Sequence, residues 1–236
     1  EELFSLKHIK MEDQRAAIVD LLINKSIVKQ DIADYSEQVF ASFKEEMKIE
    51  LDELRKSISD ERVRLRMDEK SSHEFIVYIG SDVLVFQLHS NVFRLPDENP
   101  LWKTDYMQEN GANGYFGIIN IYNFLAESFE KNRYRDLGYL IGRIFLNHNE
   151  HFMVEGKGQL GFLFRDLPNS TISKDIIRHI IQCSMSFAID FELITPPYEL
   201  TQEVSVLEVQ ALSSDIQVAT GKRLGFKFGL ENEDIF

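Results

Sequence analysis

Apolar residues recur every three or four positions along the first quarter of the chain. After Asp31 they are Ile32, Tyr35, Val39, Phe43, Met47, Leu51, Leu54 and Ile58. Residues 11–70 contain neither Gly nor Pro, the two strongest interrupters of a helix. This spacing predicts a long α-helix with one apolar stripe. Asp31 is a candidate N-cap, and an earlier helix over residues 11–23 is expected to end near residues 24–26.

A helix of this length, roughly 55 Å at 1.5 Å per residue, is too long to lie across one small domain. Its narrow stripe needs a partner, which favours a coiled-coil-like arm over residues 1–70 that forms a homodimer. The predicted interface residues are Ile32, Val39, Phe43, Met47, Leu51, Leu54 and Ile58. The alternative is that the stripe packs back on the preceding helix or on the downstream domain.

The pattern changes at His73, where the chain becomes rich in Ile, Val, Phe and Tyr. Residues 73–96 are interrupted by short polar turns, which predicts two or three antiparallel strands. Both faces of these strands are apolar, so helices should cover them. Residues 95–114 follow as a long loop, and long loops in compact domains often carry function.

Residues 115–132 and 134–149 are predicted to form two helices, with Gly138 and Gly142 on one face for close packing. Residues 151–156 and 159–166 are predicted to form a hairpin, and Ser173 is predicted to open another helix. Short strands are expected at residues 191–197, 203–210 and 223–229. The fold class is therefore α+β: the helical arm precedes a globular domain, residues 71–236, of antiparallel strands packed with several helices.

Charge and cysteine content limit the function classes. The 39 acidic and 26 basic side chains give a net charge of −13, which disfavours broad binding to nucleic acid. Cys183, the single cysteine, can form no internal disulfide and fits a reducing cytoplasm. No apolar run reaches the roughly 20 residues needed to span a bilayer, and no signal peptide is visible. We therefore expect a cytoplasmic protein without a cofactor.

Glu155 and Lys157 form an E-x-K pair on a predicted strand, where both side chains would point the same way. The pair resembles the motif of the restriction-endonuclease-like superfamily, which implies a divalent metal held with an upstream Asp, here Asp97. Three features oppose this reading. Asp97 is distant in the sequence, Gly156 and Gly158 are typical of a turn, and the chain is acidic.

His148 and His151 are spaced by three and could share a metal if they lay on one helix. No third ligand has suitable spacing, so surface residues at a helix end are the preferred interpretation. Glycine-rich phosphate loops and G-x-S-x-G are absent from the sequence.

These observations favour a non-enzymatic interaction or regulatory module that dimerises through its helical arm. A metal-dependent phosphodiester hydrolase that uses Glu155 and Lys157 is the alternative.

Overall fold

The computed structural model describes residues 13–192, 198 and 206. The chain is helical from residue 13 to Ser57 and includes a π-helical turn, η1 (Leu22–Ile27), before α2 (Val28–Ser57). The predicted helix end at residues 24–26 is therefore wrong, because the chain passes through these polar residues with the Val28 N–H donating to the Lys25 carbonyl. Asp31 lies inside the helix and is not its N-cap.

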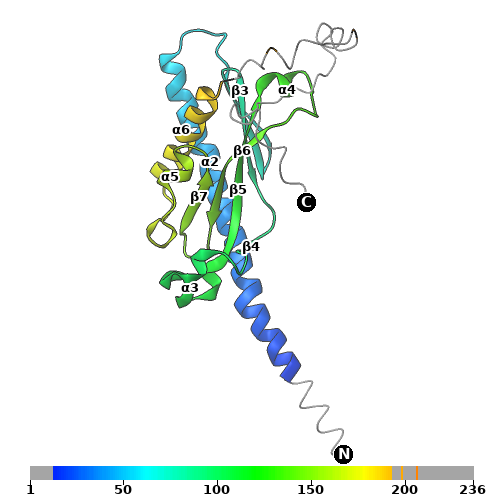
Figure 1. The fold of residues 1–236 in the computed structure, drawn as a ribbon, viewed down its shortest axis with the longest axis vertical. Helices are drawn as coiled ribbons and strands as arrows, with labels where there is room; N and C mark the ends of the chain where they lie inside the picture. The colour runs from blue at the N-terminus through cyan, green and yellow to red at the C-terminus, as the bar shows by residue number, and fades with distance from the viewer. Residues whose placement is uncertain (1–12, 193–197, 199–205, 207–236) are drawn as a thin grey trace, which may run out of the picture.

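An antiparallel sheet follows the helix, with strand order β1-β2-β3-β5-β6-β7 and β4 paired to β5 (Figure 1). The strands are β1 (Leu65–Ser71), β2 (Glu74–Ile79), β3 (Asp82–Leu88), β4 (Phe93–Arg94), β5 (Tyr115–Leu125), β6 (Tyr139–Leu146) and β7 (Phe152–Gly156). The predicted α+β class with antiparallel strands is confirmed. β1 is an edge strand of this sheet, so residues 65–70 of the predicted arm belong structurally to the strands.

One face of the sheet is covered by α2 and by α6 (Lys174–Asp190), which lie beside each other (Figure 1). The predicted N-cap of α6 is confirmed, since the Ser173 hydroxyl accepts from the Ile176 N–H at 3.3 Å. The core between these layers includes Phe43 and Met47 from α2, Phe86 from β3 and Ile180 from α6. Burial of this apolar surface is the main force that holds the helices on the sheet.

The predicted interface stripe lies in this intramolecular core. Five of its members are at most 5% exposed: Ile32, Val39, Phe43, Met47 and Leu51. Leu54 packs at the edge of the same core, and Ile58 follows the end of the helix. The stripe therefore packs on the chain's own sheet and is not available as an intermolecular seam. Helical periodicity shows that a face is covered but cannot tell whether the cover belongs to the same chain.

The two helices predicted over residues 115–149 are wrong, because β5 and β6 occupy this region. Side chains on both faces of β5 and β6 are buried over much of their length, so apolar residues occupy consecutive positions and the alternation of a half-exposed strand is lost. Gly138 and Gly142 accordingly do not lie on a helix: Gly138 lies against Phe124 of β5, and Gly142 lies against Leu160 and against Ile121 of β5. A Cβ at Gly142 would lie 3.2 Å from Leu160 Cδ1.

The predicted second hairpin is half correct. β7 forms and pairs with β6, but the second predicted strand is replaced by α5 (Leu160–Leu163). Phe191 and Glu192 are not in a strand. The rest of the strands expected at residues 191–197, 203–210 and 223–229 lies outside the described residues, apart from Val206.

Among the residues that the structure describes, those that cover the sheet face opposite α2 lie at its two ends (Figure 1). At one end, α4 (Ala126–Glu130) covers a cluster that contains Tyr78 and Val85. At the other end, residues around η2 (Pro100–Lys103) and α3 (Asp105–Glu109) cover a cluster that contains Met107 and Phe116. Within the described part of the chain, these two covers leave the middle of this face open.

Candidate functional site

A cleft of about 420 Å³ occupies the open face beside the cover that contains α3. It is lined by His89, Phe93, Arg94, Leu95, Pro96, Asn99, Phe116, Ile118, Asn120, Arg143, Phe145 and Glu155. Three polar members form a row across the sheet, since Asn120 pairs with Arg143 and Arg143 with Glu155. Alternate side chains of a strand point to opposite faces. The neighbouring residues Ile144 and Val154 face the helices, so the row lies on the sheet face that points away from α2 and α6.

Arg143 is held between a carboxylate and an aromatic ring. Its Nη2 donates to Glu155 Oε2 at 2.8 Å, and its guanidinium carbon lies 5.3 Å from the centre of the Phe145 ring. Its Nε is buried and has no hydrogen-bond partner. The Arg143 guanidinium is therefore fixed in place while only part of its donor capacity is used.

Arg94 has a similar arrangement at the rim of the cleft. Its guanidinium carbon lies 4.6 Å from the Trp102 ring centre, and its Nη1 donates to Asp97 Oδ1 at 2.5 Å. Trp102 is itself fixed by a hydrogen bond from Nε1 to the Pro96 carbonyl at 2.8 Å. The cleft is thus bordered by two arginines that aromatic rings orient.

The predicted Asp97, Glu155 and Lys157 are not brought together. Glu155 lines the cleft and pairs with Arg143, whereas Asp97 pairs with Arg94. Lys157 instead lines a small pocket on the helix side of the sheet. β7 ends at Gly156, so the same-side rule for alternate residues of a strand does not extend to Lys157.

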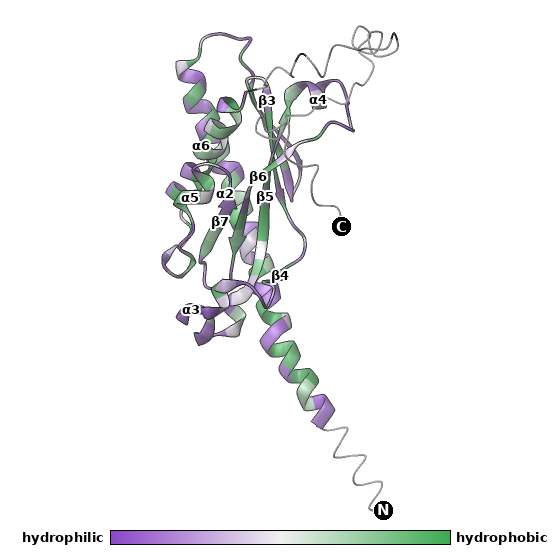
Figure 2. Ribbon diagram, in the orientation of Figure 1, coloured by the Kyte–Doolittle hydropathy of each residue, from purple (hydrophilic) through white to green (hydrophobic). Residues whose placement is uncertain are grey.

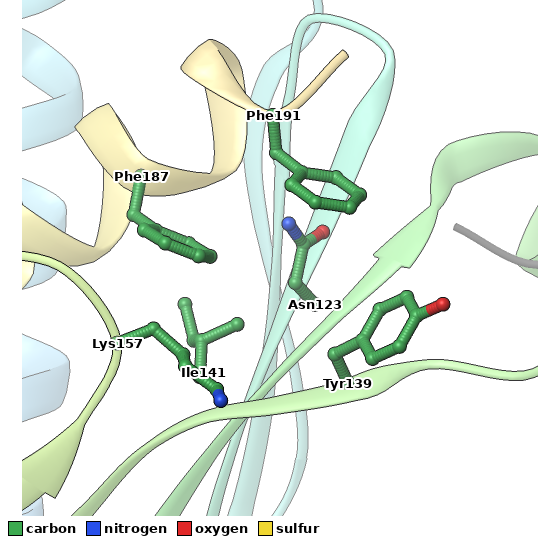
Figure 3. A pocket seen from close by; sticks show the side chains of 6 residues that line it. All are labelled: Asn123, Tyr139, Ile141, Lys157, Phe187 and Phe191. Carbon is green, nitrogen blue, oxygen red and sulfur yellow. The ribbon is translucent and has the colours of Figure 1, made fainter. Parts of the chain in front are cut away.

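Figure 3 shows this small pocket, in which the rings of Tyr139, Phe187 and Phe191 surround Asn123 and Ile141, with Lys157 beside them. Its volume of about 10 Å³ is near the minimum that holds one water molecule. Asn123 Oδ1 is buried without a hydrogen-bond partner. The pocket is too small for an organic ligand.

His148 and His151 also point to different partners. His148 Nε2 lies 2.9 Å from Asn113 Oδ1, and His151 Nδ1 lies 2.9 Å from the Leu167 carbonyl. Asn113 and the fully buried Asn147 belong to the same polar network. Among the described residues, no group of three or more His, Cys, Asp or Glu side chains is arranged to hold a metal. This network secures the turn between β6 and β7.

Burial lowers the pKa of His148 below its ordinary value of 6.5, and the nearby Asp31 carboxylate opposes this shift only in part. At higher pH the imidazole is neutral in both the folded and unfolded states. As the pH falls through 6.5, the unfolded state binds the proton more readily, so folding stability declines. We expect His148→Gln to reduce the loss of stability between about pH 7 and about pH 5. Urea denaturation at both pH values measures this, and an unchanged loss would contradict it.

Replacing Glu155 or Lys157 should change the free energy of unfolding by less than about 0.5 kcal/mol, as for other exposed side chains. Neither Mg²⁺ nor Mn²⁺ should raise the melting temperature, because selective binding to the folded state would be needed for that. Thermal melts of the unmodified protein, Glu155→Gln and Lys157→Ala, with and without metal, test both statements. A metal-induced rise that Glu155→Gln abolishes, together with DNA or RNA cleavage, would restore the hydrolase hypothesis.

The sequence analysis missed Arg94, Asn120 and Arg143, which line the cleft. A signal was present, because Asn120 and Arg143 interrupt otherwise apolar runs. Assigning those runs to helices hid the cross-strand row that these residues form.

No protein-family model, curated protein or solved structure matches the chain. Within the described part of the chain, no helix combines the length and the apolar character that crossing a bilayer requires.

Proposed function

We propose that the protein is a non-enzymatic interaction module that self-associates through residues 13–27. The observation that carries this proposal is an exposed apolar surface on the first helical turns. Six large apolar side chains there are each between 47 and 56% exposed: Ile18, Val19, Leu21, Leu22, Ile23 and Ile27. Figure 1 shows this part of the helix extending beyond the sheet, and Figure 2 shows its hydrophobic residues.

A helical segment whose apolar side chains pack against nothing is unfavourable in water. Helices in proteins gain most of their stability from packing an apolar face, and a helix that is apolar around most of its circumference is normally buried. A partner that covers residues 18–27 would remove this surface from water at about 25 cal/mol per Å² of apolar area. We therefore assign the self-association surface to residues 13–27, on the N-terminal side of the stripe that packs on the sheet.

A second copy of the chain is the partner that the charges favour. The whole chain carries −13, but residues 13–27 contain two acidic and two basic side chains and are neutral overall. Two copies therefore meet less electrostatic repulsion here than over the acidic surface as a whole. In an antiparallel pair centred between Leu22 and Ile23, Asp20 of each copy lies opposite Lys25 of the other, as a two-fold symmetric interface requires.

Light scattering coupled to size-exclusion chromatography tests the proposal. The unmodified protein should have twice the 27.5 kDa chain mass, and Leu22→Ser with Ile23→Ser should yield a folded monomer. Phe162→Ser with Ile189→Ser is the matched control, because both side chains are exposed elsewhere on the molecule. A monomeric unmodified protein at high concentration would refute self-association.

The alternative function, a metal-dependent phosphodiester hydrolase, has no comparable support, since Lys157 lies on the opposite side of the sheet from Glu155. A cytoplasmic location is proposed from the single cysteine, Cys183, which is buried and whose pKa burial raises.

A further inference from the structure

We propose that the cleft on the open sheet face binds a small organic anion. Its carboxylate or phosphate group is held by Arg143 and Arg94, and its apolar part lies against Phe145 and Ile118. This inference goes beyond self-association and does not rest on it, because the cleft lies on the globular body and not on residues 13–27.

The size and lining of the cleft suit a small molecule. Its volume of about 420 Å³ lies within the range of roughly 300–1,000 Å³ typical of ligand pockets. Apolar side chains from β4, β5, β6 and the segment after β4 form much of the wall: Phe93, Leu95, Phe116, Ile118 and Phe145. A few polar groups converge among them, which is the combination that orients a bound ligand.

Arg143 offers a donor pair that is only half used. Nε and Nη2 form one edge of the guanidinium and can donate together to two oxygens of a carboxylate or phosphate. Here Nη2 bonds Glu155, while Nε is buried and lacks a partner. A buried donor without a partner costs about 1–3 kcal/mol. The Glu155 side chain is 50% exposed and that of Arg143 is 41% exposed. In the proposed complex the ligand anion takes the place of the Glu155 carboxylate, and the Arg143 side chain turns so that its buried Nε also donates to the ligand.

The charge of the cleft opposes an anion less than the charge of the whole molecule does. Arg94 is paired with Asp97 and Arg143 with Glu155, so these four side chains sum to zero. The chain as a whole carries −13. Both guanidiniums lie over aromatic rings, which reduces the conformational freedom lost on binding.

Naphthoate and phenyl phosphate are suitable probes, because each joins an aromatic ring to an anionic group, and naphthamide is the neutral counterpart of naphthoate. Isothermal titration calorimetry should give saturable binding of at least one anion, while naphthamide binds at least about tenfold more weakly. In ¹⁵N–¹H correlation spectra the shifts should concentrate at residues 93–95, 118–120 and 143–145. The indole resonance of Trp102, the single tryptophan, reports on the neighbouring Arg94.

Arg143→Gln should weaken anion binding at least about tenfold. The affinity of Arg143→Lys should lie between those of the unmodified protein and Arg143→Gln, because lysine keeps the charge and loses the paired donors. Arg135→Gln makes the same charge change at an exposed position outside the cleft and should bind normally. If Arg143→Gln fails to fold, the proposal is tested by Arg94→Gln, which should also weaken anion binding, and by the weaker binding expected of naphthamide. The proposal is overturned if neither anion saturates, if naphthamide binds equally well, or if folded Arg143→Gln binds like the unmodified protein.

Discussion

Phe43→Ala is expected to lower the free energy of unfolding by about 3–5 kcal/mol, the usual cost of removing a buried phenylalanine ring. Phe43 is fully buried at the centre of α2. Its ring centre lies 6.0 Å from that of Phe86, which stacks on Phe75 at 4.7 Å. The substitution leaves a cavity where the helix meets the sheet. Guanidinium denaturation followed by circular dichroism measures the loss.

The same variant separates the intramolecular core from the proposed self-association surface. Phe43→Ala should leave the dimer mass that light scattering measures unchanged. Leu22→Ser with Ile23→Ser should lower that mass to the monomer value and leave the free energy of unfolding of residues 28–192 nearly unchanged. If Phe43→Ala instead dissociates a dimer without loss of stability, the dimer interface lies on the α2 stripe and not on residues 13–27. Both measurements use the same two proteins, so the two surfaces are tested independently.

The sequence was sufficient where one physical signal dominated. The stripe from Ile32 to Leu54 predicts a helix because its steps of three and four persist without Gly or Pro. Residues 73–88 predict strands because β-branched and aromatic residues are concentrated there between short turns. Ser173 was identified as an N-cap because a hydroxyl before an apolar periodic segment satisfies an exposed backbone N–H.

The sequence was insufficient where tertiary packing decided the outcome. β5 is apolar at consecutive positions, as a buried helix can be, since its residues pack toward α2 and α6 on one face and toward η2 and α3 on the other. The cleft depends on register: Asn120, Arg143 and Glu155 become neighbours only once three strands are aligned. The E-x-K spacing was misleading because it assumes that one strand holds both residues. β7 ends at Gly156, between Glu155 and Lys157.

Gly117→Val is expected to destabilise the fold by about 3 kcal/mol or more, at the upper end of the cost of overpacking. Gly117 lies on β5 where α2 crosses the sheet, directly against Ser36. A Cβ at Gly117 would lie 2.9 Å from Ser36 Cβ and closer still to its hydroxyl. That hydroxyl donates to the Ile32 carbonyl at 2.6 Å within the helix, so it cannot turn aside without losing a buried hydrogen bond.

A double-mutant cycle identifies the cause, because contacting residues show non-additive effects. Gly117→Ala should destabilise by about 1–3 kcal/mol, while Gly111→Ala, at an open position, should have little effect. Ser36→Gly alone should cost about 1 kcal/mol through helix propensity and loss of the hydroxyl. Combined with Gly117→Ala it should recover part of the loss, since it removes the atoms that the new methyl group meets. Additive losses in urea denaturation would mean that the close approach of α2 to β5 at Ser36 does not limit the size of residue 117.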